Sequence, residues 1–241
     1  MKELPTPVSI EAISDGYDDG GVDEAGSYAV YITRFKEVGL DTLSQLIQKL
    51  KNCGCPVNCI VYDPFLPWAV EVAKKFGLVS AAFFTQNCTV DNIYYHVAKG
   101  VIKLPPTQVD EEILLPGLSC TIETSDVPSF VSTPESDILV EMLVNQFSNL
   151  QKADWILINS FYELEKEDVW EMGIKAKQDE KGIVRREVIE ECIKLVMEEE
   201  KGNVIRGNAK KWKELARNAM DEGGSSDKNI EEFVSKLMTI S

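Results

Sequence analysis

Short apolar segments alternate with amphipathic segments through the first 167 of the 241 residues, and this alternation constrains the fold more than any other feature. The apolar segments have the length and the β-branched content of buried strands. They are Val8 to Ile13, Val57 to Tyr62, Val79 to Phe84 and Trp155 to Asn159. Such strands, alternating with helices, predict an α/β fold whose parallel sheet is covered by helices on both faces.

Apolar residues spaced by three or four predict the helices between these strands. We expect them at about Tyr28 to Leu50, from Asp63-Pro64 to Phe76 with Gly77 as its end, Cys88 to Lys99 and Asp137 to Leu150. Ligands of open α/β sheets bind beyond the carboxyl ends of the strands. The loops after the four strands are therefore the places to look for a site.

The strand pattern stops after Glu167, and the composition changes there. Residues 1–167 hold 11 basic and 24 acidic residues, whereas residues 168–241 hold 14 and 16. Three helices are expected in the second part, at about Arg185 to Glu200, Val204 to Met220 and Asp227 to Met238. Three helices over 74 residues are typical of the end of a larger domain. We therefore predict two parts, 1–167 and 168–241.

Net charge limits the classes of partner. The chain has 25 Lys and Arg against 40 Asp and Glu, a formal net charge of −15. A field of this sign repels nucleic acid and anionic lipid, so we expect neither nucleic-acid nor membrane-surface binding. The sequence lacks an apolar run near the roughly 18 residues of a membrane span and lacks a signal-peptide pattern at its start. We expect a soluble, cytoplasmic protein, whose oligomeric state the sequence leaves open.

Three of the six cysteines cluster at Cys53, Cys55 and Cys59. Their spacing matches no common zinc pattern, and the single histidine, His96, lies in another segment. We therefore expect reduced cysteines and no metal site.

Asp63 follows a buried strand directly and is the most informative carboxylate. One interpretation is a helix N-cap, which needs only a side-chain oxygen and a free backbone N–H. Another is a carboxylate that orients a catalytic histidine. The two roles are compatible. His96 is the obvious candidate base, but its place two turns into a predicted helix favours a structural role.

The segment Phe84 to Asn87 puts an aromatic and three polar side chains, Thr85, Gln86 and Asn87, at the carboxyl end of a strand. A wall of an acceptor pocket and a packed core followed by a polar turn fit equally well. Neither a GxGxxG nor a GxxxxGK[ST] loop occurs, so no phosphate-cradling glycine loop of those types is expected.

Several strings together resemble plant family-1 UDP-glycosyltransferases. They are ISDGYDDGG from Ile13, CIVYDPFLPWAVEVAKKFGL from Cys59, AAFFTQNCTVDNIYYHV from Ala81, ADWILINSFYELE from Ala153 and DEGGSSDKNIEEFV from Asp221. The resemblance covers nearly the whole chain in order.

The resemblance implies a GT-B enzyme with two Rossmann-like domains, one holding an acceptor and the other UDP-glucose as co-substrate, without a cofactor or metal. A histidine base, partnered by an aspartate, assists attack by an acceptor hydroxyl or carboxylate, and the sugar is inverted. The resemblance gives Asp63 as that partner and places Phe84, Thr85, Gln86 and Asn87 at the acceptor pocket. Expected acceptors are flavonoids, phenolic acids and terpenoids.

Two departures from the family pattern stand out. The opening segment that carries the catalytic histidine has no counterpart before Val8, and His96 matches an ordinary helix position. The sugar-nucleotide signature is also absent, so no donor-binding residue can be assigned, and the chain reads as joined between Glu167 and Asp168. We thus expect a truncated family member, a partial acceptor domain followed by a helical remnant of the donor domain, with little or no transferase activity. The alternatives are a non-catalytic small-molecule-binding fragment and an incomplete gene product.

Overall fold

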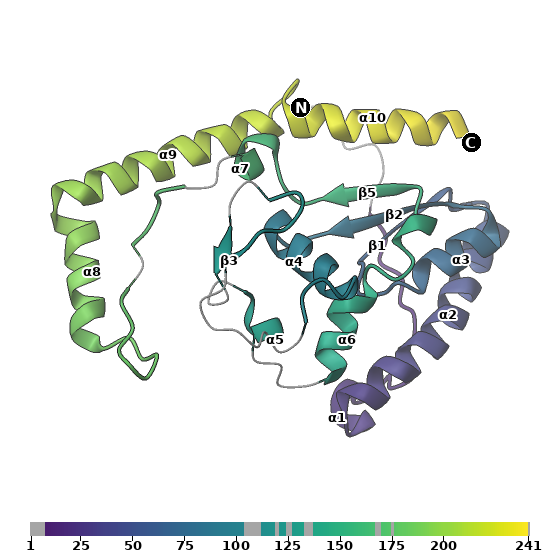
Figure 1. The fold of residues 1–241 in the computed structure, drawn as a ribbon. Helices are drawn as coiled ribbons and strands as arrows, with labels where there is room; N and C mark the ends of the chain where they lie inside the picture. The colour runs from purple at the N-terminus through teal and green to yellow at the C-terminus, as the bar shows by residue number, and fades with distance from the viewer. Residues whose placement is uncertain are drawn as a thin grey trace. The chain divides into compact units, whose positions relative to one another are not determined.

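A computed structural model describes residues 8–103, 112–118, 121–123, 127–132, 137–166, 170–174 and 176–240. The Cα positions divide the chain into two compact units, one holding the described residues up to Asn159 and the other Ser160 to Ile240 (Figure 1). The predicted boundary between Glu167 and Asp168 lies outside the described residues. The assignment of the two parts to acceptor and donor domains stays a prediction.

The first unit contains a three-stranded parallel sheet in the order β1-β2-β5. The strands are β1 (Cys59–Tyr62), β2 (Val79–Phe84) and β5 (Trp155–Ile158). In register, Tyr62 lies beside Ala82, and Phe84 lies beside Ile158. The mixed α/β class with a parallel sheet is therefore confirmed, and three of the four predicted strands form.

The predicted strand from Val8 to Ile13 does not form. This segment is unpaired, and the Val8 and Ile10 side chains are 94% and 95% exposed. Its alternating pattern is compatible with a strand, but a strand exists only where another backbone accepts its hydrogen bonds. Ile13 alone packs against the core.

The helices of the first unit include the four that were predicted and three short ones, at 21–25, 129–132 and 150–152, that were not. They are α1 (Gly21–Ala25), α2 (Tyr28–Asn52), α3 (Ala69–Phe76), α4 (Cys88–Ala98), α5 (Ser129–Ser132), α6 (Asp137–Asn145) and the 3-10 helix η2 (Leu150–Lys152). Two predicted bounds differ from the structure. Helix α6 ends at Asn145 and not at about Leu150, and α3, which was expected to begin at Asp63-Pro64, begins at Ala69. Pro67 lacks an N–H and disfavours helical geometry at Leu66, so separate turns fill the segment before Ala69.

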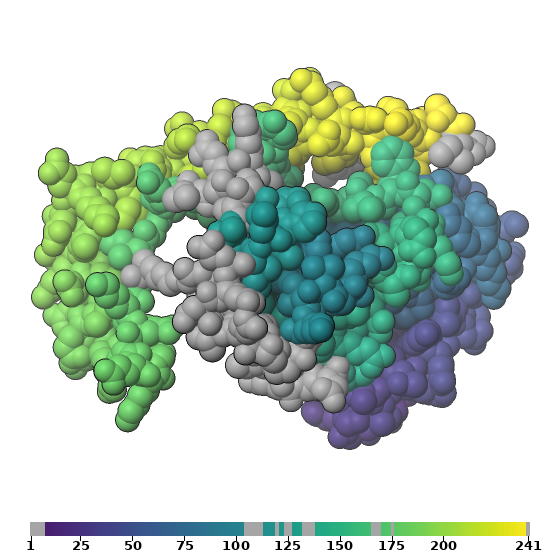
Figure 2. All heavy atoms as spheres, in the orientation of Figure 1, coloured from purple at the N-terminus to yellow at the C-terminus, as the bar shows by residue number. Residues whose placement is uncertain are grey.

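Two apolar clusters hold this unit together. The first joins the sheet residues Tyr62, Ala82 and Phe84 to Trp68 and to Val70 of α3, with α2 packed on it. The second lies around α4 and α6 and includes a short antiparallel pair, β3 (Glu112–Ile113) and β4 (Ile122–Glu123). The outer side of α4 lies at the surface in the view of Figure 2. Both clusters include Phe147 on their border, so the core is continuous.

The second unit contains helices and no strand among its described residues, and the three helices predicted after Glu167 form. Its helices are α7 (Tyr162–Lys166), α8 (Arg186–Glu198), α9 (Glu200–Met220) and α10 (Ser225–Ile240). Trp212 of α9 is buried, with 5% of its surface exposed, and donates its indole N–H to the Trp170 carbonyl at 3.2 Å. No residue of α8 is buried.

Candidate functional site

Asp63 lies immediately after β1, at the carboxyl end of the sheet, and its side chain is exposed. One carboxylate oxygen accepts a hydrogen bond from the Phe65 backbone N–H at 2.9 Å, and the Leu66 N–H donates to the Asp63 carbonyl at 2.8 Å. These bonds close a tight Asx-type turn. The side chain therefore caps a turn and not a helix. Trp68 occupies the N-cap position of α3, which begins six residues after Asp63, so the helix N-cap interpretation is wrong. Among the described residues, the second carboxylate oxygen has no hydrogen-bond partner.

The next strand brings its own polar turn to the same end of the sheet. β1 and β2 are parallel neighbours, so Asp63 and the residues after Phe84 leave the sheet at adjacent points. On the other side, the Asn159 N–H donates to the Phe84 carbonyl at 2.8 Å and extends the pairing of β5 beyond its last strand residue. Three of the four loops that the sequence analysis singled out thus meet at one edge.

The four predicted acceptor residues have different environments. Phe84 is 5% exposed and stacks on Phe147 with ring centroids 5.7 Å apart, so its ring belongs to the core. Asn87 caps α4 through its side-chain oxygen, which accepts from the Thr89 N–H at 2.8 Å. Thr85 is exposed and Gln86 is half-buried. The structure contains no ligand contact for any of them, so their acceptor role stays a prediction.

Two amide oxygens, one just after β2 and one in α4, have no hydrogen-bond partner in the described part of the chain. They belong to Gln86 and to Asn92 of α4, and both atoms are inaccessible to solvent. The Asn92 amide nitrogen is already used, because it donates to the Pro116 carbonyl at 2.9 Å. A buried acceptor without a donor is costly, so these oxygens favour a polar hydrogen from elsewhere. Asn92 had not been singled out, since an asparagine inside a helix gives no local signal of this kind.

His96 has the structural role that its sequence position favoured. It is 7% exposed on α4, and its Nδ1 lies 2.9 Å from the Asn92 carbonyl one turn earlier, so the ring nitrogen donates to that oxygen. The Tyr95 ring packs edge-on against it at 5.5 Å. As the only histidine in the 241 residues, it is unavailable as a base for the Asp63 edge.

Tyr62, the last residue of β1, is also an unsuitable base. It is 6% exposed, and burial raises the pKa of its hydroxyl, with a smaller contribution from the charge of Asp154. A tyrosine whose pKa is raised stays protonated at neutral pH. Asp63 is thus the ionisable group that this edge offers.

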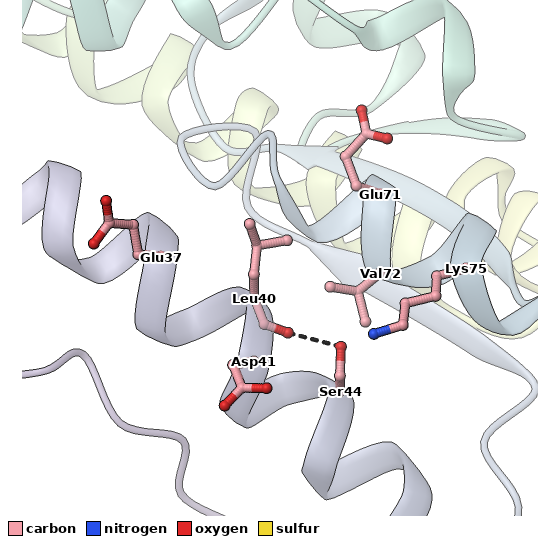
Figure 3. Close-up of a pocket in the computed structure, with 7 residues that line it drawn as sticks. All are labelled: Glu37, Leu40, Asp41, Ser44, Glu71, Val72 and Lys75. Atoms are coloured by element: carbon pink, nitrogen blue, oxygen red, sulfur yellow. Dashed lines mark hydrogen bonds between the residues drawn. The ribbon is translucent and has the colours of Figure 1, made fainter.

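A hollow of about 350 Å³ lies between α2 and α3 (Figure 3). Its lining includes the carboxylates of Glu37, Asp41 and Glu71, and the Ser44 hydroxyl at its floor donates to the Leu40 carbonyl at 2.7 Å. One cation, Lys75, also lines the hollow, so the charge of its lining stays negative and disfavours a carboxylate or a diphosphate. The hollow contains none of the predicted site residues and does not form the acceptor edge.

Two further searches cover only the described residues. No group of three or more His, Cys, Asp and Glu side chains in these ranges is placed to hold a metal ion. Within the same ranges, every helix is too short or too polar to span a bilayer.

Curated proteins with similar sequences are plant glycosyltransferases. UDP-glycosyltransferase 74F2 of Arabidopsis thaliana is 44% identical over 173 residues, which cover 70% of this chain and 36% of that protein. Crocetin glucosyltransferase 2 of Crocus sativus is 44% identical over 168 residues, covering 68% and 35%. Flavonol 7-O-beta-glucosyltransferase UGT74F1 of Arabidopsis thaliana is 40% identical over 163 residues, covering 66% and 34%. The chain thus spans about a third of the length of these relatives. No family model matches the chain.

Solved structures with a similar fold are also glycosyltransferases. The structure of Os79 from O. sativa with UDP and deoxynivalenol-3-glucoside has a TM-score of 0.83 at 22% identity, covering 98% of this chain and 91% of that chain. A UDP-glucosyltransferase from Polygonum tinctorium capable of glucosylating indoxyl has a TM-score of 0.73 at 14% identity, covering 86% and 82%. At these identities the likeness concerns the fold alone.

Proposed function

The chain belongs to the plant UDP-glycosyltransferases with their GT-B fold, and on that premise we propose that its first unit provides the acceptor side of a glucosyl transfer. In that reaction a hydroxyl or carboxylate of a small plant metabolite attacks the anomeric carbon of UDP-glucose. The sugar is inverted and UDP leaves. The proposal for this chain concerns binding and orientation of the acceptor.

The observation that carries the proposal is the meeting of Asp63 and Gln86 at the carboxyl edge of β1 and β2. The Gln86 carbonyl oxygen has no donor among the described residues, and a hydroxyl hydrogen of a bound acceptor would reach it once the side chain turns outward. Phe84 and Phe147 stack directly behind this edge and give it an apolar backing for an aromatic molecule. A small ring bearing hydroxyl groups fits this combination of surfaces.

Asp63 is the positioning residue of the proposal. Its turn occupies one carboxylate oxygen through Phe65, and the exposed second oxygen remains for another partner. A carboxylate in this place can orient the ring N–H of a histidine and stabilise the imidazolium formed when that histidine accepts the acceptor's proton. The histidine must come from outside the 241 residues, because His96 is buried in α4.

We therefore propose that the 241 residues bind an acceptor without transferring glucose to it. General-base assistance contributes roughly 10² to 10⁴ in rate, and positioning of donor against acceptor contributes more. The second candidate function, an enzyme active as it stands, differs in one observable. It requires UDP-glucose turnover by this chain alone.

Titration calorimetry with a flavonol and with UDP tests the proposal. The full chain is expected to bind the flavonol, and Gln86→Ala should weaken that binding about tenfold through the lost hydrogen bond. Gln45→Ala is the matched control, because Gln45 lies exposed on α2 and bonds only Asp41. Equal affinities of the two variants would refute the role of Gln86. Glucoside formation from UDP-glucose above a boiled control would refute the binding-only proposal.

Two finer points also belong to the proposal. A flavonoid is the acceptor class that we expect, since a relative is named a flavonol glucosyltransferase. We also propose a cytoplasmic location. Competition among flavonols, phenolic acids and terpenoids in the same titration checks the first point, and fractionation of the source tissue checks the second.

A further inference from the structure

The end of α2 carries two cysteines that the proposed function leaves unused. Cys53 and Cys55 are both exposed free thiols, separated only by Gly54. The third cysteine of the cluster, Cys59, is half-buried in β1. The structure thus separates the cluster into an exposed pair and a shielded member, which the sequence spacing alone did not distinguish.

The backbone holds the exposed pair across a tight turn. The Cys55 N–H donates to the Leu50 carbonyl at 3.0 Å, and the Gly54 N–H donates to the Lys51 carbonyl at 3.2 Å. These two bonds form a Schellman motif, with Gly54 in the left-handed region at φ +80°. The two cysteines flank that glycine.

The turn keeps the Cα atoms of the two cysteines within the range that a disulfide can span. Even a fully extended three-residue segment separates its outer Cα atoms by only about 7 Å. The left-handed turn shortens this separation, and disulfides join Cα atoms about 4.4 to 6.8 Å apart. A ring that spans three residues removes little chain entropy and is strained, so such a disulfide is a reversible bond and contributes little to stability.

The surroundings distinguish the pair from Cys59. Lys49 lies one helical turn before Cys53; its pKa is raised chiefly by the hydrogen bond with Glu11, and the charge of Cys53 adds a smaller contribution. The thiolate is the nucleophile in disulfide exchange, and both thiols of the pair are open to solvent. At Cys59, burial raises the pKa of the thiol and disfavours the thiolate, and the Asp154 charge adds to this.

We propose that Cys53 and Cys55 form a thiol–disulfide exchange site for small disulfides of the glutathione type. The thiolate of one cysteine attacks a sulfur of the small disulfide, forms a mixed disulfide and releases one small thiolate. The thiolate of the second cysteine then attacks the Sγ of the first cysteine in the mixed disulfide and releases the second small thiolate. The two cysteines are oxidised to one disulfide, the small disulfide is reduced to two thiols, and two protons pass from the protein thiols to solvent or the leaving thiolates.

This site is independent of the proposed acceptor edge. The loop from Cys53 leads into the amino end of β1, whereas Asp63 follows the carboxyl end. Oxidation is therefore expected to leave acceptor binding unchanged. Failure of disulfide exchange would therefore leave the proposed acceptor binding untouched, and the reverse also holds.

The test uses the folded full chain and oxidised glutathione, followed by alkylation of remaining thiols and mass analysis of the peptide that begins after Lys51. In the unaltered chain this peptide should lose two hydrogen atoms and carry no glutathione. Cys53→Ser and Cys55→Ser should each stop at the mixed disulfide, with roughly tenfold more bound glutathione than the unaltered chain, because intramolecular closure is fast. Cys59→Ser is the matched control and should behave like the unaltered chain.

Two results would overturn the inference. One is persistent glutathione on both Cys53 and Cys55 of the unaltered chain, which means that the turn does not allow closure. The other is loss of the intramolecular disulfide in Cys59→Ser, which means that Cys59 is the partner. Circular dichroism of each variant controls for folding, and exposed cysteines tolerate serine.

Discussion

The two units of the chain bury their apolar residues to very different extents. The first unit closes a core in which Val70, Ala73, Ala81 and Ala82 are fully buried. The second unit buries only residues of α9 among its described helices, while Ile193 and Met197 of α8 remain more than half exposed. A parallel sheet with its crossover helices supplies its own core, whereas three sequential helices contact one another along narrow stripes.

Because the first unit buries the larger core, we expect it to contribute most of the free energy of unfolding. Because the candidate acceptor edge also belongs to that unit, acceptor binding should depend on the sheet and its helices and be insensitive to changes in α8 to α10. Paired substitutions, one in each unit, test this difference.

The largest effect is expected for Trp68→Ala. Trp68 is 6% exposed and packs edge-on against Phe35 of α2 at 5.5 Å, so truncation leaves a cavity between α2 and the sheet. The expected loss of unfolding free energy is about 3 to 5 kcal/mol. Urea denaturation followed by circular dichroism measures it. The paired change, Trp212→Ala in α9, should leave the urea midpoint of the first unit unchanged. Equal destabilisation of the first unit by this change would show that its stability depends on the second unit.

Smaller changes in stability, of opposite sign, are expected for Gly39→Ala and Gly207→Ala. A Cβ at Gly39 of α2 would lie 2.7 Å from the Trp68 ring, so overpacking should cost about 1 to 3 kcal/mol. Gly207 of α9 has open space around it, so alanine should stabilise that helix by about 0.5 to 1 kcal/mol. Thermal unfolding of both variants gives the two signs. Destabilisation by Gly207→Ala would show that α9 is packed more closely than described.

The smallest effect is expected at the amino ends of β2 and β5, where Asp154 joins the strands to α3. Its carboxylate accepts from the Lys74 ammonium at 2.7 Å and from the Ser80 N–H and hydroxyl at 2.9 Å. Burial raises the pKa of this carboxyl, but the hydrogen bonds from Lys74 and Ser80 outweigh it and lower the pKa overall. Since the pair is partly exposed, Asp154→Asn should cost only about 1 kcal/mol at pH 7.

The pH dependence of this loss follows from the lowered pKa. A carboxyl whose folded pKa lies below its unfolded value stabilises the fold above the unfolded value, near 3.8, and loses this contribution as the pH falls through the folded pKa. The difference between the unaltered chain and Asp154→Asn should therefore be constant from pH 7 to 5 and shrink below about pH 4. Urea titrations across this range measure it. Glu232→Gln in α10 should show a trend of the same sign but smaller size, because the hydrogen bond from Lys236 also lowers the pKa of Glu232, at a pair more exposed to solvent.

The sequence predicted the local part of this fold well and the non-local part poorly. β2 forms over the predicted residues, and Gly77 ends α3 in the left-handed region as expected, because both depend on neighbouring residues. The strand predicted at Val8 to Ile13 was wrong, since the alternation of apolar and polar residues cannot show whether a partner strand exists. The predicted start of α3 was wrong because Pro67 separates the Asp63 turn from the helix.

The candidate site was predictable to the level of strand ends. Asp63 and Gln86 follow strands whose carboxyl ends must meet in a parallel sheet. The assignment of Phe84 to the core and the buried oxygen of Asn92 depend on tertiary packing, which no spacing in the sequence reveals.

Amide NMR of the full chain, titrated with a flavonol, tests the central claim most directly. The account predicts chemical-shift changes that cluster at Asp63 to Phe65 and at Thr85 to Thr89, with none over Arg186 to Met238. Shift changes confined to the helices of the second unit, or no changes at saturating flavonol, would contradict the assignment of the acceptor site to the sheet edge.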